Sequence, residues 1–345
     1  MLPRAARLWW DFADRTSWGH RVTLINVRVI NGDALRESAD LLVLKFAQAW
    51  HGVDREVARR LEVEGRPGPS DGTNAYVRSN GTLAARGVLF LGVPPLRRFG
   101  YEEIRVFGRR AVAEAATAAP DAAELMLTLH GPNYGLDEIE AFNSQLAGVV
   151  DAITHNQAGR AVRMITFVEY DVGRAERMRE ILSAAIPTGT LRPGVEAAEA
   201  GVEAEAAGRM STVGFDSAAK AHVFVAMPFT PEFEDVYTFG ITPAVHASSL
   251  LVERIDQTAF VGDIVAQMRE RIAGARLFVA DVTGANPNVY LEIGFAWGNR
   301  IPTLLVCRDV DELRFDVRGH RCLSYGNIVE LQRKLTKEIA TLLAS

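Results

Sequence analysis

Residues 277–296 read LFVADVTGANPNVYLEIGFA, and this stretch decides the fold of the C-terminal part of the chain. Its first five residues, Leu277–Asp281, are apolar up to the final aspartate and predict a buried strand. Asn286-Pro287-Asn288 predicts a turn, with Asn288 as the side-chain cap of the helix that follows. The stretch is therefore a strand, a polar loop and a helix, which is the repeating unit of a parallel α/β sheet.

The same unit recurs on both sides of this stretch. Short apolar strands alternate with helical segments, which implies crossover connections and an open α/β sandwich of four or five parallel strands. The expected strands are His222–Ala226, Leu250–Arg254, Leu277–Asp281 and Thr303–Cys307, and the expected helices are Asp235–Ser248 (broken near Pro243), Asp263–Ala273, Tyr290–Trp297 and Ile328–Leu343.

The N-terminal half alternates in the same way, so we expect a second α/β domain with a mixed or largely parallel sheet. Its expected strands are Arg21–Ile30, Leu41–Phe46, Gly87–Val93, Glu124–Leu129 and Ala161–Glu169, and its expected helices are Asp54–Leu61, Tyr101–Ala119, Leu136–Asn156 and Gly173–Ala185. An Ala-, Glu- and Gly-rich stretch near 194–217 has little apolar periodicity and predicts a linker or an exposed helix. The expected division is residues 1–190, a linker over 191–219, and residues 220–345.

Composition excludes several classes of protein. The 345 residues carry a net charge of −5, so there is no global basic field for nucleic-acid binding. The two cysteines have no metal-binding spacing, and we expect neither a metal nor a cofactor. No signal peptide or membrane-spanning run is evident, which predicts a cytoplasmic protein.

Polar and acidic side chains follow the C-terminal strands at the point where each strand ends. In open parallel sheets ligands bind at the carboxyl ends of the strands, so these residues form the predicted site. The predicted catalytic residues are Glu292 and Asp281, and the predicted substrate-binding residues are Met227, Pro228, Phe229, Arg254, Asp256, Gly262, Asp263, Asn286, Asn288 and Gly294.

Glu292 is the strongest candidate among them. We place it in the first turn of its helix, where the helix dipole favours an ionised carboxylate, and Gly294 would let a ligand approach the backbone. A carboxylate in a dry cleft suits the oxocarbenium-like centre that forms when a ribosyl C1′–N bond breaks.

Other interpretations of these residues stay open. Glu292 could be a helix N-terminal charge with no chemistry, and Asp281 could cap a loop. Asp256 and Asp263 are better structural than catalytic candidates. Phe229 could stack on a base or fill the core, and Arg254 could meet a phosphate or pair with Asp256.

The C-terminal motifs, taken as an ordered set, resemble the nucleoside 2-deoxyribosyltransferase-like superfamily and its TIR-like bacterial branch. The resemblance rests on Val223–Phe229, Ile255-Asp256, Gly262–Ile264, Val279–Asn288, Tyr290–Ala296 and Phe315–His320, and covers about 120 residues. It implies a flavodoxin/TIR-like fold and cleavage of N-glycosidic bonds of nucleosides, nucleotides or NAD, with Glu292 as nucleophile or catalytic acid. Some family members complete the site with a neighbouring subunit, so a homo-oligomer is expected.

Four loops of the N-terminal half follow predicted strands and are rich in Gly and Asn, which suits either phosphate binding or ordinary turns. They are Asn31–Asp33, His51–Asp54, Gly92–Pro95 and Thr128–Gly135. The overall pattern resembles macro-like domains, including the N-terminal domain of leucyl aminopeptidases, without a diagnostic motif. That resemblance implies an ADP-ribose-type ligand and no particular residue.

These observations favour an enzyme that cleaves an N-glycosidic bond of NAD or a related nucleotide. Family analogy extends this to a bacterial defence effector switched on by an ADP-ribose-like or cyclic-nucleotide activator. Two alternatives remain: a non-catalytic nucleotide sensor, and a nucleoside deoxyribosyltransferase of salvage metabolism.

Overall fold

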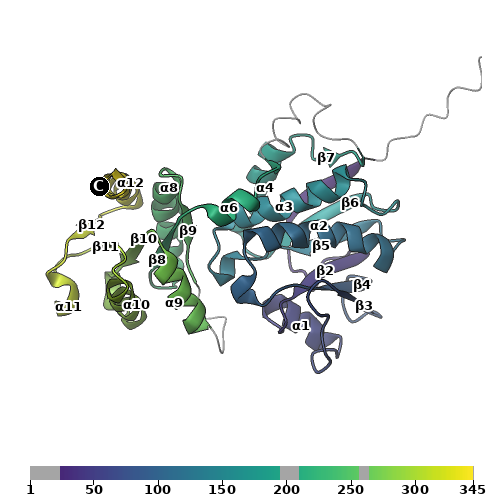
Figure 1. Ribbon diagram of the computed structural model, residues 1–345, viewed down its shortest axis with the longest axis horizontal. Coiled ribbons are helices and arrows are strands. Elements are labelled where there is room, and N and C mark those ends of the chain that lie inside the picture. The colour runs from purple at the N-terminus through teal and green to yellow at the C-terminus, as the bar shows by residue number, and fades with distance from the viewer. Residues whose placement is uncertain (1–23, 195–209, 256–263, 345) are drawn as a thin grey trace, which may run out of the picture.

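The computed structural model describes residues 24–194, 210–255 and 264–344. They form two α/β units, each with its own sheet, that lie side by side (Figure 1). The expected two-domain α/β class is confirmed. No helix in these ranges is long and apolar enough to cross a membrane.

The N-terminal unit contains a seven-stranded mixed sheet in the order β3-β4-β2-β5-β6-β1-β7. The five inner strands are parallel, while β3 and β7 at the two edges are antiparallel to their neighbours. The strands are β1 (Ile25–Asn31), β2 (Leu41–Phe46), β3 (Asn74–Arg78), β4 (Gly87–Gly92), β5 (Glu124–Thr128), β6 (Met164–Glu169) and β7 (Thr190–Leu191).

Four helices accompany this sheet: α1 (Gly52–Arg60), α2 (Tyr101–Ala118), α3 (Glu138–Thr154) and α4 (Val172–Ala185). Helices α2 and α3 touch backbone to backbone because each presents a glycine to the other. A Cβ atom on Gly108 would lie 2.2 Å from the Gln145 carbonyl oxygen, and one on Gly148 would lie 1.9 Å from the Arg105 carbonyl oxygen. Only glycine fits at these two positions.

The C-terminal unit contains a five-stranded parallel sheet in the order β12-β11-β10-β8-β9. Numbered within the unit, this is the order 2-1-3-4-5 of flavodoxin-like doubly wound sheets, as predicted. The strands are β8 (His222–Ala226), β9 (Leu251–Glu253), β10 (Leu277–Asp281), β11 (Thr303–Cys307) and β12 (Cys322–Ser324).

Helices cover both faces of this sheet. The helical segments of this unit are α7 (Pro231–Asp235), a π-helical segment (Val236–Ile241), α8 (Thr242–His246), α9 (Ile264–Gly274), α10 (Pro287–Gly298), α11 (Phe315–Arg318) and α12 (Ile328–Ala344). Helix α6 (Phe215–Ala219), which precedes β8, contacts α2 of the N-terminal unit. Odd-numbered residues of β10 face the core that includes α12, and even-numbered ones face α9 and α10. The helix expected over Asp235–Ser248 is divided close to Pro243, because the π segment ends at Ile241 and α8 begins at Thr242, although the backbone stays helical across this junction.

The end of the predicted linker packs against the N-terminal unit. Met210 is buried, and the guanidinium of Arg105 on α2 donates to the carbonyl oxygens of Met210 and Val213. Ser217 on α6 donates to Glu140 on α3. The low apolar content predicted an exposed connection, but these backbone carbonyls are held by a buried arginine. Residues 195–209 lie outside the described ranges.

Candidate functional site

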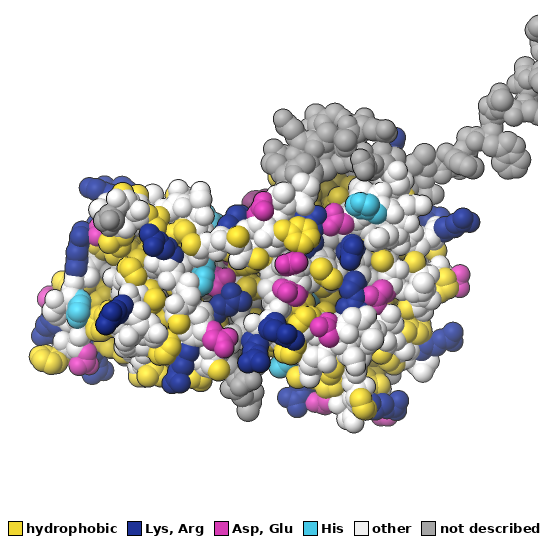
Figure 2. Space-filling view, in the orientation of Figure 1, with side chains coloured by type: hydrophobic (Ala, Val, Ile, Leu, Met, Phe, Trp, Pro, Cys, Tyr) yellow, Lys and Arg dark blue, Asp and Glu magenta, His cyan; other side chains and the backbone are white. Residues whose placement is uncertain are grey.

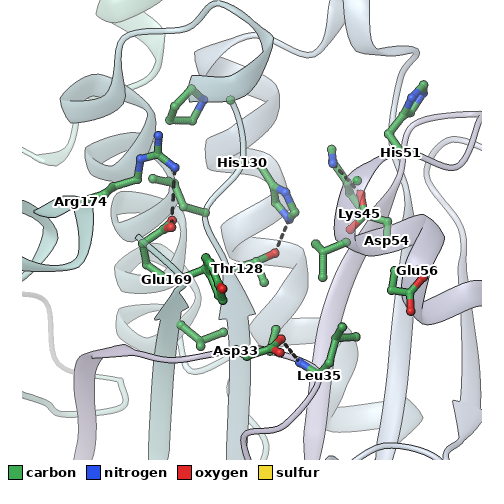
Figure 3. A pocket seen from close by; sticks show the side chains of 18 of the residues that line it. Asp33, Leu35, Lys45, His51, Asp54, Glu56, Thr128, His130, Glu169 and Arg174 are labelled. Atoms are coloured by element: carbon green, nitrogen blue, oxygen red, sulfur yellow. Dashed lines mark hydrogen bonds and ion pairs between the residues drawn. The ribbon is translucent and has the colours of Figure 1, made fainter. Parts of the chain in front are cut away.

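A cavity of about 370 Å³ lies at the carboxyl ends of β1, β2, β5 and β6 in the N-terminal unit (Figure 3). Three of the four Gly- and Asn-rich loops contribute to it, through residues 32–35, 51–54, 128–132 and 134. The loop Gly92–Pro95 is not among its lining residues. The sequence predicted each of these loops separately, and the order of the strands in the sheet places them next to one another.

A buried ion pair forms one wall of this cavity. Lys45 Nζ lies 2.6 Å from Asp54 Oδ2, and both side chains are at most 3% exposed. Burial alone would lower the pKa of Lys45, but the charge of Asp54 and the Tyr134 phenol raise it above its ordinary value. Lys45 therefore stays an ammonium. The pair was missed from the sequence, although a lone lysine inside the apolar strand LLVLKF was an available signal.

The ion pair with Lys45 uses only the Oδ2 atom of Asp54. Its Oδ1 atom is buried and has no hydrogen-bond partner among the described residues. A buried carboxylate oxygen without a partner is costly, and it is commonly satisfied by a water molecule or a ligand. Because Asp54 lines the cavity, a donor placed there would satisfy this oxygen.

Two histidines in the cavity are neutral near pH 7. Burial, Lys45 and Arg55 lower the pKa of His51 to about 4. Burial, followed by the charge of Lys45, lowers the pKa of His130 well below its ordinary value. Uncharged imidazoles each offer one donor and one acceptor, so they suit hydrogen bonding to a polar ligand rather than charge pairing.

The carboxylates around the cavity are matched by basic groups. Besides the Lys45–Asp54 pair, Glu169 lies 3.6 Å from Arg174, and Glu56 bonds to Arg59 and Arg60 on the surface of α1. The space-filling view likewise shows basic and acidic side chains interspersed over one face of the molecule (Figure 2). A molecule placed in this cavity would therefore meet individual hydrogen-bonding groups and little net charge.

At the C-terminal sheet edge, Asp281 ends β10 and is fully buried. The Tyr325 hydroxyl donates to its Oδ2 atom over 2.6 Å, and the Thr283 backbone N–H donates to Oδ1 over 3.0 Å. Burial raises the pKa of Asp281, while these two hydrogen bonds act in the opposite direction. Asp281 is therefore a buried carboxyl held by two donors, which also fits the loop-capping interpretation.

Glu292 lies on α10 and is 5% exposed. The cap of this helix is Asn286, whose side chain accepts the Asn288 N–H at 2.9 Å, so the expected cap at Asn288 is wrong. Proline fits the first helical position, which moves the helix start to Pro287. Glu292 consequently lies in the second turn and not the first, where the dipole has little effect. Its side chain is buried on the same side of the helix as Val289 and Ile293, which pack on the sheet.

The two predicted catalytic carboxylates approach the sheet from opposite faces. Asp281 shares the face of Leu277 and Val279, which is covered by α12. Helix α10, which carries Glu292, packs on the other face through Val289 and Ile293. One further polar atom there, the hydroxyl of Tyr290, is buried without a hydrogen-bond partner in the described part of the chain.

The remaining predicted residues differ in their exposure and contacts. Met227 and Pro228 are buried, and the half-buried Phe229 contacts Arg254. Asn288 and Gly294 are exposed, and no heavy atom lies within 4 Å of a Cβ built on Gly294. Asp256, Gly262 and Asp263 lie outside the described residues. The Arg254 guanidinium lies 3.9 Å from the Tyr237 ring centroid and 2.8 Å from Glu234, which is its partner in the described structure.

Comparisons with known proteins give weak structural likenesses only. No protein-family model matches the chain, and no curated protein is significantly similar to it. A Trypanosoma brucei macrodomain in complex with ADP is 16% identical, covering 46% of this chain and 69% of its own, with a TM-score of 0.38. An Oceanobacillus iheyensis macrodomain with MES bound is 15% identical, covering 49% and 96%, with a TM-score of 0.38. A glycine-to-valine mutant of that macrodomain with ADPR is 16% identical, covering 49% and 98%, with a TM-score of 0.37.

Proposed function

We propose that the protein binds a nucleotide in the cavity of the N-terminal unit. The observation that carries this proposal is the Oδ1 atom of Asp54, which has no hydrogen-bond partner in the described part of the chain and belongs to a residue lining a cavity at the carboxyl ends of four parallel strands. That edge is where open α/β sheets bind ligands, and the volume of about 370 Å³ lies within the range of ligand pockets.

Nucleotide chemistry fits the groups that line this cavity. A ribose hydroxyl can donate to Asp54 Oδ1, and the neutral His51 and His130 can bond to sugar or base. Gly52 has a positive φ angle of 48°, and the only heavy atom of the described residues within 4 Å of a Cβ built there is the Tyr134 hydroxyl at 3.7 Å, so this loop has room for a phosphate to approach the backbone. Because the charges around the cavity are balanced, we expect these hydrogen bonds to hold the ligand, and not attraction to a cluster of basic side chains.

Calorimetric titration with AMP, ADP and ADP-ribose tests this binding. We expect saturable binding to the purified protein and a loss of about tenfold or more in affinity for Asp54→Asn, since asparagine keeps only one acceptor oxygen, which Lys45 occupies, and presents an NH2 donor in place of the other. Thr128→Val, which alters a second lining residue without touching the ion pair, should weaken binding more mildly. Glu64→Gln, on a surface pair with Arg55, is the matched control and should bind normally. The absence of binding to any of the three nucleotides would reject the proposal.

A second proposal concerns the C-terminal unit, which we infer to cleave an N-glycosidic bond. The specific observation in its favour is Glu292, a buried carboxylate on α10, the helix that follows β10. The switch point of the sheet lies between β8 and β10, and doubly wound sheets bind ligands at the carboxyl ends of the strands there. In this reaction the C1′–N bond breaks, the base leaves with the bonding pair, and the Glu292 carboxylate stabilises or traps the C1′ cation. Water or another base then bonds to C1′.

Incubation with NAD, NADP, nucleoside 5′-phosphates and deoxynucleosides, with products identified by mass spectrometry, tests this second proposal. Addition of a second free base distinguishes transfer from hydrolysis. Glu292→Gln should reduce base or nicotinamide release by at least about a thousandfold, because it removes the reacting carboxylate. Glu270→Gln, on the exposed side of α9, is the control. Release by Glu292→Gln at the wild-type rate would reject the assignment and leave a nucleotide-binding protein without turnover.

A further inference from the structure

A second cavity, of about 300 Å³, lies between the two units. The N-terminal unit lines it with Pro132, Glu138 and Arg174 among other residues, and the C-terminal unit lines it with Glu234, Tyr237 and Arg254. Both walls carry an arginine beside a glutamate. Neither unit forms this cavity alone.

Arg174 lies between this interdomain cavity and the N-terminal cavity. Arg174 and Pro132 line both cavities. The Nε atom of Arg174 bonds at 2.9 Å to Glu138, which lines the interdomain cavity, and its Nη1 lies 3.6 Å from Glu169, which lines the N-terminal cavity. The two cavities therefore adjoin at one guanidinium.

The opposite wall belongs to the ligand-binding edge of the C-terminal sheet. Arg254 follows β9 directly, at the carboxyl edge of the strands. Its guanidinium lies over the rings of Tyr237 and Phe229 at 3.9 Å and 5.2 Å, and Phe229 follows β8 at the same edge. Its ion-pair partner Glu234 is 52% exposed, so an incoming phosphate competes with a solvated carboxylate.

Buried polar contacts fix the two units relative to each other at this place. Asp137 Oδ2 accepts from His246 at 2.6 Å and from the Val252 backbone N–H at 3.0 Å. Tyr101 donates to Glu253 at 3.1 Å and accepts the Asp137 N–H at 2.8 Å. Since Asp137, Tyr101 and Glu253 are buried, these bonds hold the interdomain cavity at a set width.

We propose that the two cavities form one composite site for a two-part ligand, a nucleotide whose diphosphate carries a second sugar or nucleoside. One half lies in the N-terminal cavity, and the diphosphate passes Arg174 so that the other half reaches Arg254 and the C-terminal sheet edge. Each cavity alone is at the small end of the range for ligand pockets, about 300–1,000 Å³, whereas the pair suits a larger molecule. This inference rests on the proposed nucleotide binding at the N-terminal cavity and names the ligand class of that site.

Affinities for ADP-ribose and AMP, measured by calorimetry on the full chain, test the composite site. Wild-type protein should bind ADP-ribose at least about tenfold more tightly than AMP, because only ADP-ribose spans both cavities. Arg254→Met retains an apolar side chain over Tyr237 and should cost about tenfold in ADP-ribose affinity while changing AMP affinity less than about twofold. Glu234→Gln releases Arg254 from its ion pair and should strengthen ADP-ribose binding, an effect that misfolding cannot produce. Arg321→Met, at the exposed start of the far edge strand β12, is the control.

Each outcome separates this inference from the proposed function. Wild-type protein that binds AMP and ADP-ribose equally, or an Arg254→Met variant that binds both as the wild type does, overturns the composite site and leaves nucleotide binding intact. Equal losses for AMP and ADP-ribose in Arg254→Met also overturn it, since they indicate a shift of the whole unit. Wild-type protein that binds neither ligand rejects the proposed function and this inference together.

Discussion

Asp137 and His246 join the two α/β units through a hydrogen bond of 2.6 Å between a fully buried carboxylate and a half-buried imidazole. The same carboxylate has a second task, because its Oδ1 atom accepts the N–H groups of Ile139 and Glu140 at the start of α3. A helix cap of the N-terminal unit is therefore also an anchor of the C-terminal unit. Changes at Asp137 should affect both units.

The Asp137–His246 bond should make stability depend on pH. Burial lowers the pKa of His246, but the hydrogen bond and charge of Asp137 outweigh it and raise the pKa above 6.5. The bond therefore stabilises the fold fully below about pH 6.5 and is lost as pH rises through the higher folded value. Urea unfolding of wild type and His246→Gln should show a stability difference that shrinks from about pH 6 to pH 9. Asp137→Asn should abolish this trend, and a difference independent of pH would contradict it.

The crossing of α2 and α3 should not tolerate a side chain at Gly148. A Cβ atom there would lie 1.9 Å from the Arg105 carbonyl oxygen, so the helices must separate. Gly148→Ala should lower the free energy of unfolding by about 2 kcal/mol or more, measured by urea denaturation. Gly298→Ala is the matched control, because no heavy atom lies within 4 Å of its Cβ position. Equal stabilities of the two variants would contradict the steric argument.

Apolar periodicity predicted the buried parallel strands well. The bounds of β2, β8, β10 and β11 agree with the sequence prediction, since each is a short apolar run ended by polar residues. The edge strands β3, β7 and β12 were missed. Strand β3 alternates half-buried and exposed residues, and the other two span only two or three residues, so pairing partners rather than composition create them.

The candidate sites were harder to predict than the fold. Asp281 was predicted from its position at the end of β10 and Glu292 from its place on the helix that follows, but the cap at Asn286 and the burial of Asp281 against Tyr325 depend on packing. The N-terminal cavity depends on the order of four strands that are distant in the sequence. Residue propensities do not predict the order of strands in a sheet, which is why Asp54 was not predicted to be a site residue.

Removing one partner of the Lys45–Asp54 pair should lower the free energy of unfolding strongly, whereas replacing both partners with apolar residues should lower it little. Lys45→Met leaves a buried carboxylate without its counter-charge, and we expect a loss of about 3–5 kcal/mol in unfolding free energy. The double variant Lys45→Met/Asp54→Leu removes both charges and should recover most of that loss. Arg55→Gln breaks the exposed pair with Glu64, and the expected cost is below about 1 kcal/mol. A double variant as unstable as Lys45→Met would show that the charges are not the cause.

Tyr325→Phe tests whether Asp281 takes part in the proposed cleavage as a carboxylate. The Tyr325 hydroxyl donates to Asp281 and opposes the rise in pKa that burial causes, so its removal should raise the pKa of Asp281 further. An ionised Asp281 is lost as pH falls through its pKa, and a higher pKa makes that loss begin at a higher pH. The acid limb of the kcat/KM profile for base release should therefore move to higher pH in Tyr325→Phe, while its plateau changes little. Tyr76→Phe, on the edge strand β3, should leave the profile unchanged, and an unmoved acid limb in a folded Tyr325→Phe protein would restrict Asp281 to loop capping.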